Sequence, residues 1–326
     1  MNSTRRVGST FIELLPEDSF LNKHFSITAL VPLLVRWMMH WQGRRPDASA
    51  ARLVQVLFGQ SYSLLCAGMG PVLLAIGVAD WLAIASPPKT SERTLASMLR
   101  DRTVFFDQAL SVALVSVEQV VILGAGFDTR LYEYCRGRDL GLFEVDQIET
   151  QAVKKQALKQ SGIDIGNVHF VTVNFADEDW MQGLISGGFN LGKRTFFLWE
   201  GVTYYLTKAE VEKGFALMNQ VCGDGSAIAF DFFSEALVND ERTRLGTAVF
   251  NMIGEPLRFG LEVSKGVEAG LVDIIANTGL SLDKVQTIES WIGEKPEPAG
   301  RAASGLLSGN VLGGFATLKK DRKHKK

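Results

Sequence analysis

From residue 119 onward, the chain alternates short, uninterrupted apolar runs with helix-like stretches. The apolar runs are "QVVILG", "DLGLFEVD", "VHFVTVN", "RTFFLWE" and "SAIAFDFF". Between them, residues 128–136, 148–160, 177–185 and 208–222 have helical character. Strands of a parallel sheet that helices cover on both faces read as continuous apolar runs. The pattern therefore predicts an α/β fold with a doubly wound, mostly parallel sheet, to which "LDKVQTI" and "NVLGGFATL" add two late strands.

Residues 1–90 lack this alternation and read as helical. "FSITALVPLLVRWMMHWQ" is apolar nearly all round, and "ASAARLVQVLF" follows the turn signal "GRRPD". Two prolines in "ASPPKTSE" end this region, because proline interrupts a helix, and a helix over residues 91–116 follows. We therefore expect a helical N-terminal cap over residues 1–90 and a second domain over residues 91–326.

Residues 61–80 raise the question of membrane contact. The stretch contains 19 uncharged residues before Asp80, which is close to the length of a membrane span. It also contains three glycines and a proline. We interpret it as a buried helix or a broken helix pair, with membrane contact as the alternative.

Composition excludes several classes of protein. The net charge of −2 gives no overall basic field for nucleic acid. Three cysteines and four histidines are scattered along the chain, so neither a disulfide framework nor a metal site is expected. We expect His169, within an apolar run, to be a packed core side chain. The first residues lack the apolar block of a signal peptide, and a cytoplasmic location is expected.

The stretch "VVILGAGFDTR" joins the first predicted strand to a glycine-containing turn. Ligands of open parallel sheets bind beyond the carboxyl ends of the strands. Gly124 and Gly126 would let the backbone approach such a ligand without a Cβ in the way, and a helix starting near Asp128 would direct N–H groups at it. The alternative is a purely steric role for both glycines. A dinucleotide fingerprint would need glycine at position 129, where the chain has Thr129, so an NAD enzyme is disfavoured, whereas a nucleoside ligand without a pyrophosphate is compatible with the turn.

Two acidic residues end neighbouring predicted strands. Asp146 follows Gly126 by 20 residues, and its carboxylate could accept hydrogen bonds from both hydroxyls of a ribose. The alternative is that it only caps the next helix. Glu144 should point to the same side of the strand as Asp146. Glu200 closes a buried apolar run, where a charge is costly unless it is paired. The glycine turn, Asp146 and Glu200 should therefore face one crevice.

Several stretches in this order resemble a known family. They are "LRDRTVFFDQAL", "QVVILGAGFDTRLY", "LFEVDQIETQAVKKQAL", "FVTVNFADEDW", "FFLWEGVTYYLTKAEV" and, more loosely, "GEPLRFGL", which together extend over about residues 99–260. They resemble the leucine carboxyl methyltransferase-like family of S-adenosylmethionine-dependent methyltransferases. This family includes protein-phosphatase carboxyl methyltransferases and small-molecule O-methyltransferases of bacteria and fungi. Residues 1–85 match poorly, so the substrate does not carry over.

The resemblance implies S-adenosyl-L-methionine as the cofactor, bound in a class I methyltransferase-like fold. Arg102 would pair with the methionine carboxylate, because a guanidinium holds a carboxylate by two parallel hydrogen bonds. The implied positions for the other residues are Gly124 and Gly126 beneath the methionine moiety, Asp146 at the ribose, Asn174 and Phe175 at the adenine, and Glu200 near the amino-acid end. Asn174 departs from the usual aspartate, and Phe175 could stack on the adenine.

The resemblance leads to the hypothesis of an O-methyltransferase. Its acceptor would be a carboxylate or hydroxyl of a small molecule, or a protein C-terminal carboxylate. A hydroxyl acceptor needs a general base, which the sequence does not identify, whereas a carboxylate acceptor calls for a nearby cation, for which Arg258 is a candidate. The alternatives are a nucleotide-binding oxidoreductase with a degenerate fingerprint and a non-catalytic, membrane-associated protein that uses residues 61–80. Neither the acceptor nor the oligomeric state follows from the sequence.

Overall fold

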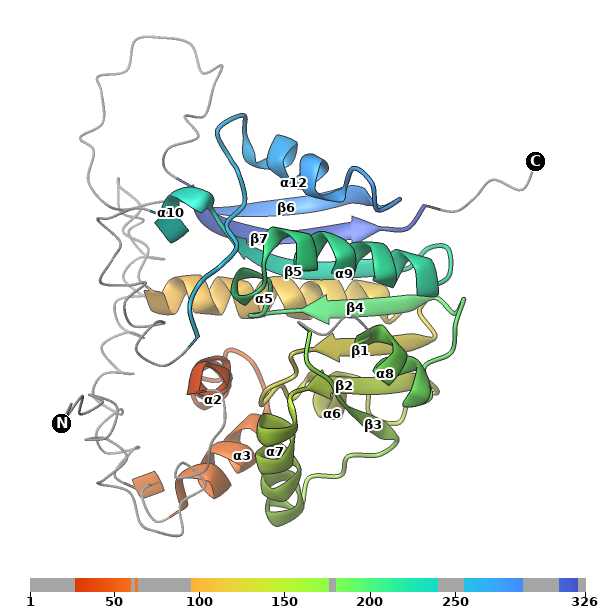
Figure 1. Cartoon of the computed structure of the whole chain (residues 1–326). Helices are drawn as coiled ribbons and strands as arrows, with labels where there is room; N and C mark the ends of the chain where they lie inside the picture. Colours follow the sequence, from red (N-terminus) through yellow and green to blue (C-terminus); the bar gives the residue numbers. More distant parts are fainter. Residues whose placement is uncertain are drawn as a thin grey trace, which may run out of the picture.

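The structure, a computed structural model, contains a mixed sheet of seven strands in the order β3-β2-β1-β4-β5-β7-β6 (Figure 1). Only β7 among them runs antiparallel to its neighbours, β5 and β6. This confirms the predicted α/β class with a mostly parallel sheet. The structure describes residues 27–59, 62–63, 95–175, 180–239, 255–289 and 311–321. The strands are β1 Gln119–Leu123, β2 Gly141–Asp146, β3 Val168–Thr172, β4 Thr195–Trp199, β5 Ala227–Phe233, β6 Ser281–Glu289 and β7 Val311–Lys319.

Helices cover both faces of this sheet, as the doubly wound pattern predicts. The α-helices described are α2 Leu30–Trp41, α3 Ala48–Phe58, α5 Leu95–Ala113, α6 Arg130–Tyr134, α7 Ile148–Ser161, α8 Trp180–Ser186, α9 Lys208–Val221, α10 Glu235–Asn239 and α12 Val267–Ile275. The 3-10 helices are η2 Ile27–Ala29 and η4 Thr203–Tyr205. Their side chains divide between two cores: one contains residues of α2, α3, α5, α6 and α7, and the other contains residues of α8, α9 and α12.

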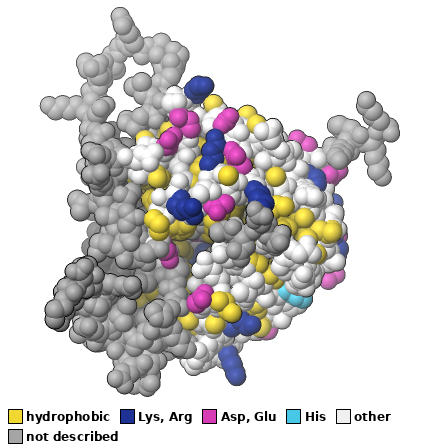
Figure 2. All heavy atoms as spheres, viewed as in Figure 1, with side chains coloured by type: hydrophobic (Ala, Val, Ile, Leu, Met, Phe, Trp, Pro, Cys, Tyr) yellow, Lys and Arg dark blue, Asp and Glu magenta, His cyan; other side chains and the backbone are white. Residues whose placement is uncertain are grey.

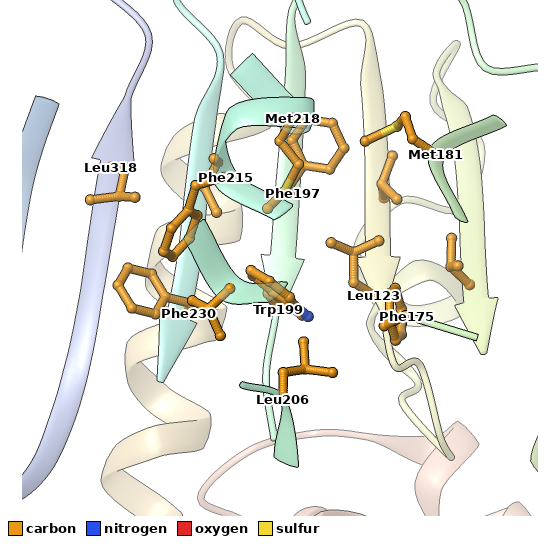
Figure 3. Close-up of a cluster of buried hydrophobic side chains, with 14 of the residues drawn as sticks. Leu123, Phe175, Met181, Phe197, Trp199, Leu206, Phe215, Met218, Phe230 and Leu318 are labelled. Carbon is orange, nitrogen blue, oxygen red and sulfur yellow. The ribbon is translucent and has the colours of Figure 1, made fainter. Parts of the chain in front are cut away.

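The strands supply alternate side chains to these two cores. In β1, Val120 and Ile122 belong to the core beneath α5, whereas Val121 and Leu123 belong to the core beneath α8 and α9 (Figure 3). All of β1 and β4 is buried, so the strands have no polar face. The continuous apolar runs of the sequence follow from this burial on both sides.

The edge strand β3 is the exception. His169 is exposed there, so the expectation of a packed core histidine was wrong. Its ring stacks on Phe143 of β2 with the ring centroids 5.1 Å apart. β3 has a neighbour on one side only, and its residues His169 and Thr172 are exposed. An apolar run at a sheet edge therefore does not imply burial of each residue in it.

The N-terminal region is helical where the structure describes it. α2 packs against α5, and α3 packs against α7. Residues 61–80 lie outside the described part except for Tyr62 and Ser63, so the structure does not test the interpretation of that stretch. None of the helices within the described ranges combines the length and apolar character that crossing a membrane requires. On the face shown in Figure 2, Lys and Arg side chains are interspersed with Asp and Glu side chains.

Candidate active site

The glycine turn after β1 is fixed to the end of β2. Gly124 and Gly126 have φ values of +65° and +43°, a region that glycine occupies without the steric cost of a Cβ. The Gly124 N–H donates to the Val145 carbonyl at 2.8 Å. The Gly126 N–H donates to Oδ2 of Asp146 at 2.5 Å. The predicted turn thus exists, and Asp146 lies directly beside it.

The turn is also closely packed against two segments far away in the sequence. A Cβ added at Gly124 would lie 2.2 Å from Cγ2 of Val202, just after β4. A Cβ added at Gly126 would lie 3.0 Å from the Cβ of Ala29, at the end of η2. In Figure 1, the arrows of β1 and β4 point toward α2. Ala29 and the helix α2 that follows it therefore lie at the carboxyl ends of these strands.

The Asp146 carboxylate accepts hydrogen bonds from the backbone on both of its oxygens. Its Oδ1 accepts from the Gln147 N–H at 2.7 Å, while Oδ2 accepts from Gly126. Burial raises the pKa of Asp146, and these two hydrogen bonds partly offset that effect. An ionised carboxylate has about four lone-pair positions, so two remain for a ligand.

Glu144 does not join this site. Its Oε2 pairs with the Lys154 Nζ at 2.6 Å, and its Oε1 accepts from the Tyr132 hydroxyl at 2.7 Å. Its side chain is buried, and burial raises its pKa. Lys154 of α7 and Tyr132 of α6 thus enclose the Glu144 carboxylate in the core. Glu144 was predicted to point to the same side of the strand as Asp146, but it takes no part in the candidate site.

Arg102 and Glu200 come together as a buried ion pair. The Arg102 Nε lies 3.0 Å from Oε1 of Glu200, although neither atom makes an aligned hydrogen bond with the described residues. The Arg102 Nη1 also lies 3.2 Å from Oδ2 of Asp231 and donates to the Tyr204 hydroxyl at 3.4 Å. The other Asp231 oxygen accepts from the Gly201 N–H at 2.8 Å. Asp231 therefore connects Arg102 to the turn that follows Glu200.

Two more buried arginines surround the second oxygen of Glu200. Oε2 accepts from Nη1 of Arg130 at 2.6 Å and from Nη2 of Arg36 at 3.4 Å. Both arginines also contact Oδ2 of Asp128, at 2.5 Å and 2.8 Å respectively. Burial alone would raise the pKa of Glu200, but Arg130, Arg102 and Arg36 together lower it below its usual value. Three guanidinium groups thus keep Glu200 ionised in the interior.

The residues of the "DTR" stretch attach the N-terminal helices to the sheet. The Thr129 hydroxyl donates to Oδ2 of Asp47 at 2.7 Å, and the Arg130 Nε donates to Oδ1 of Asp107 at 2.7 Å. Arg45 pairs with both Asp47 and Asp107. The Arg130 N–H donates to Asp128 at 2.7 Å, so the expected start of the helix near Asp128 moves to Arg130. The sequence pattern predicted that N–H groups at this helix start would point at a ligand. The Arg130 N–H instead points at the Asp128 carboxylate.

Phe175 and Asn174 follow β3. Phe175 is buried and packs edge-to-face on Trp180, with the ring centroids 5.3 Å apart (Figure 3). Its ring also lies beside the glycine turn, since a Cβ added at Gly124 would be 4.0 Å from the Phe175 ring. Asn174 is exposed. Gly124, Gly126, Asp146 and Phe175 therefore lie together, and Arg102 and Glu200 form a buried pair. The sequence reasoning missed Arg36, Asp128, Arg130 and Asp231.

Asp231 could have been found by the argument used for Glu200. It is the lone acid of the apolar run "SAIAFDFF", and a buried charge requires a partner. Arg36 carried a similar signal as the main charge of an otherwise apolar helix. Asp128 and Arg130 are separated by one residue in the turn, and their burial depends on partners that lie far away in the sequence.

Part of the chain is similar in sequence to known methyltransferases. Residues 75–219 match the family model "Leucine carboxyl methyltransferase". The chain is 30% identical over 181 residues to a putative S-adenosyl-L-methionine-dependent methyltransferase of Mycobacteroides abscessus, covering 54% of this chain and 58% of that protein. It is 33% identical over 153 residues to YktD of Bacillus subtilis, which has the same description. This match covers 44% of this chain and 49% of that protein.

The chain thus spans about half the length of these curated relatives. Among solved structures, a SAM-dependent methyltransferase of Methanosarcina mazei shares 13% identity with a TM-score of 0.42, over 66% of this chain and 98% of that chain. The residues that match the leucine carboxyl methyltransferase family model, 75–219, include the glycine turn, Arg102, Asp146 and Glu200.

Proposed function

We propose that this chain is an S-adenosyl-L-methionine-dependent O-methyltransferase. The observation that supports the proposal most is the convergence of four elements on one place. Arg102 comes from α5, the glycine turn follows β1, Asp146 ends β2, and Glu200 follows β4. Ligands of doubly wound sheets bind at this edge. The family match and the relatives' descriptions support the same function.

The residues fit the charges of the cofactor. An amino-acid group presents a carboxylate and an ammonium, which complement the Arg102 guanidinium and the Glu200 carboxylate. Both have a buried atom that lacks a hydrogen bond from the described residues, Nε and Oε1 respectively. Asp146 would accept hydrogen bonds from the ribose, and the two glycines would allow close approach of the backbone. Val202 and Ala29 contact the turn, so these side chains would have to move when the cofactor binds.

When bound, S-adenosyl-L-methionine supplies an electrophilic methyl group on a sulfonium. The task of the protein is then to hold donor and acceptor in line and to exclude water. The acceptor would be a small molecule with a carboxylate or a hydroxyl group, or a protein C-terminus.

The first prediction concerns Arg102. Arg102→Ala should weaken the binding of S-adenosylhomocysteine tenfold or more, because the variant loses the guanidinium that would hold the carboxylate. Isothermal titration calorimetry measures the affinity. Arg100→Ala is the matched control, since Arg100 is two positions away and its side chain is 29% exposed beside Asp101.

Removal of Arg102 also leaves Glu200 and Asp231 without one partner, so circular dichroism must show that the variant is folded. Arg102→Lys keeps the positive charge and should show an intermediate loss, because an ammonium does not grip a carboxylate with two parallel bonds. A folded Arg102→Ala protein with unchanged affinity would remove Arg102 from the proposed site.

A further inference from the structure

Residues 258–261 are held by backbone hydrogen bonds against the turn after β4 and the end of β5. The N–H groups of Arg258 and Phe259 donate to the Tyr204 carbonyl at 2.8 Å and 3.3 Å. The Leu261 N–H donates to the Phe233 carbonyl at 2.7 Å. The neighbouring Tyr204 side chain contacts Arg102. The backbone therefore holds this loop beside the candidate active site.

Glu255 is linked to the glycine turn through Thr28 and Ala29. Its carboxylate accepts a hydrogen bond from the Thr28 hydroxyl. Thr28 precedes Ala29, which contacts the glycine turn. Thr28 also makes a side-chain hydrogen bond with Tyr205. Burial is the main reason for the raised pKa of Asp146, and the negative charge of Glu255 adds to it.

The charges around Glu255 favour one kind of acceptor. Arg36, Arg102 and Arg130 are all paired with carboxylates of the site. The Arg258 side chain, the candidate cation for a carboxylate acceptor, is 48% exposed and lies 3.9 Å from Oε2 of Glu210. A carboxylate acceptor would therefore meet the negative charge of Glu255 without a cation from the described residues to balance it. A hydroxyl acceptor would instead find a group that accepts its proton.

We infer that Glu255 is the general base for a hydroxyl acceptor, an alcohol or phenol, an inference that rests on the proposed methyl transfer. The hydroxyl oxygen uses one of its electron pairs to bond to the methyl carbon as the carbon–sulfur bond breaks, and both electrons of that bond remain on sulfur. The hydroxyl proton moves to a Glu255 carboxylate oxygen, which releases it to water after the product leaves. Thr28 orients the carboxylate through its hydrogen bond.

The test combines binding with transfer. Wild type, Glu255→Gln and Glu262→Gln are titrated with S-adenosylhomocysteine, and all three should bind it within threefold of one another. Glu262 is a matched control because it is exposed and lies in the same segment. The proteins are then given methyl-labelled S-adenosyl-L-methionine with phenols, alcohols and carboxylic acids of matched carbon skeleton. Mild alkali releases methanol from methyl esters and leaves methyl ethers intact, so it distinguishes the two products.

We expect alkali-stable products from hydroxyl probes, a loss of rate on the order of 100-fold or more in Glu255→Gln, and a normal rate in Glu262→Gln. With a phenol probe, the Glu255→Gln rate should rise about tenfold per pH unit below the phenol's pKa of about 10, since a phenolate needs no base. Alkali-labile products, transfer unaffected by Glu255→Gln, or no transfer to any hydroxyl probe would overturn the role of Glu255. Absence of S-adenosylhomocysteine binding by the wild type would instead overturn the proposed function.

Discussion

Arg130→Met should destabilise the folded protein by about 3–5 kcal/mol, the usual cost of removing one partner from a buried ion-pair network. The Arg130 side chain is fully buried and contacts Asp128, Glu200 and Asp107. Methionine fills similar space but supplies no positive charge, so the variant would bury carboxylates with too few cations. Urea denaturation followed by circular dichroism measures the change in the free energy of unfolding.

Arg136→Met is the matched control for this change. Arg136 pairs with Asp164 at 3.2 Å, but the two side chains are 68% and 60% exposed, so its loss should be below about 1 kcal/mol. Adding Asp128→Asn to Arg130→Met should recover part of the stability, because it removes one of the carboxylates left without a partner. Equal losses for the two arginine variants would contradict the network described for the site.

Gly124→Ala should destabilise the protein by about 2–5 kcal/mol and weaken S-adenosylhomocysteine binding. The left-handed backbone at this position costs an L-residue about 1–2 kcal/mol. The new methyl group would also lie 2.2 Å from Val202 Cγ2, and overpacking of this kind costs about 1–3 kcal/mol. Thermal or urea unfolding reports the first effect, and calorimetry with S-adenosylhomocysteine reports the second.

Gly137→Ala separates the two contributions. Gly137 has a φ of +73°, but an added Cβ there meets no atom within 4 Å, so only the backbone cost of about 1–2 kcal/mol should appear. Val202→Ala in the Gly124→Ala background should remove much of the difference in stability between the two glycine variants, because it removes the methyl group that clashes. If Gly124→Ala proves no more costly than Gly137→Ala, the close packing between the turn and Val202 is not present in solution.

Much of the fold could be predicted because its signals are local. Burial on both faces makes β1 and β4 apolar after their first residue, and the glycine turn requires two positive φ angles. The direction of β7 had no such signal, since an antiparallel strand between two neighbours can have the same composition as a parallel one. The exposure of His169 depends on its place at the sheet edge, which the sequence of β3 does not reveal.

The site, like the fold, was predicted only where a local sequence signal marks its residues. The positions of Arg102, Asp146 and Glu200 follow from strand ends and from the family resemblance. The roles of Asp128 and Arg130 depend on Arg36 and Asp107, which are 92 and 23 residues distant from their partners. A buried charge is stable only with such partners, and pairing over these distances is a tertiary property.

The hydrogen bond from Thr129 to Asp47, together with Arg45 between Asp47 and Asp107, bears on how this molecule unfolds. Separating α2 and α3 from the sheet would leave Asp128 and Arg130 hydrated and half-paired, so neither part keeps its stability alone. The two predicted domains, residues 1–90 and 91–326, are therefore joined by buried ion pairs and a buried hydrogen bond. A truncated chain that begins after α3 should lose cooperative melting altogether instead of retaining an intact sheet.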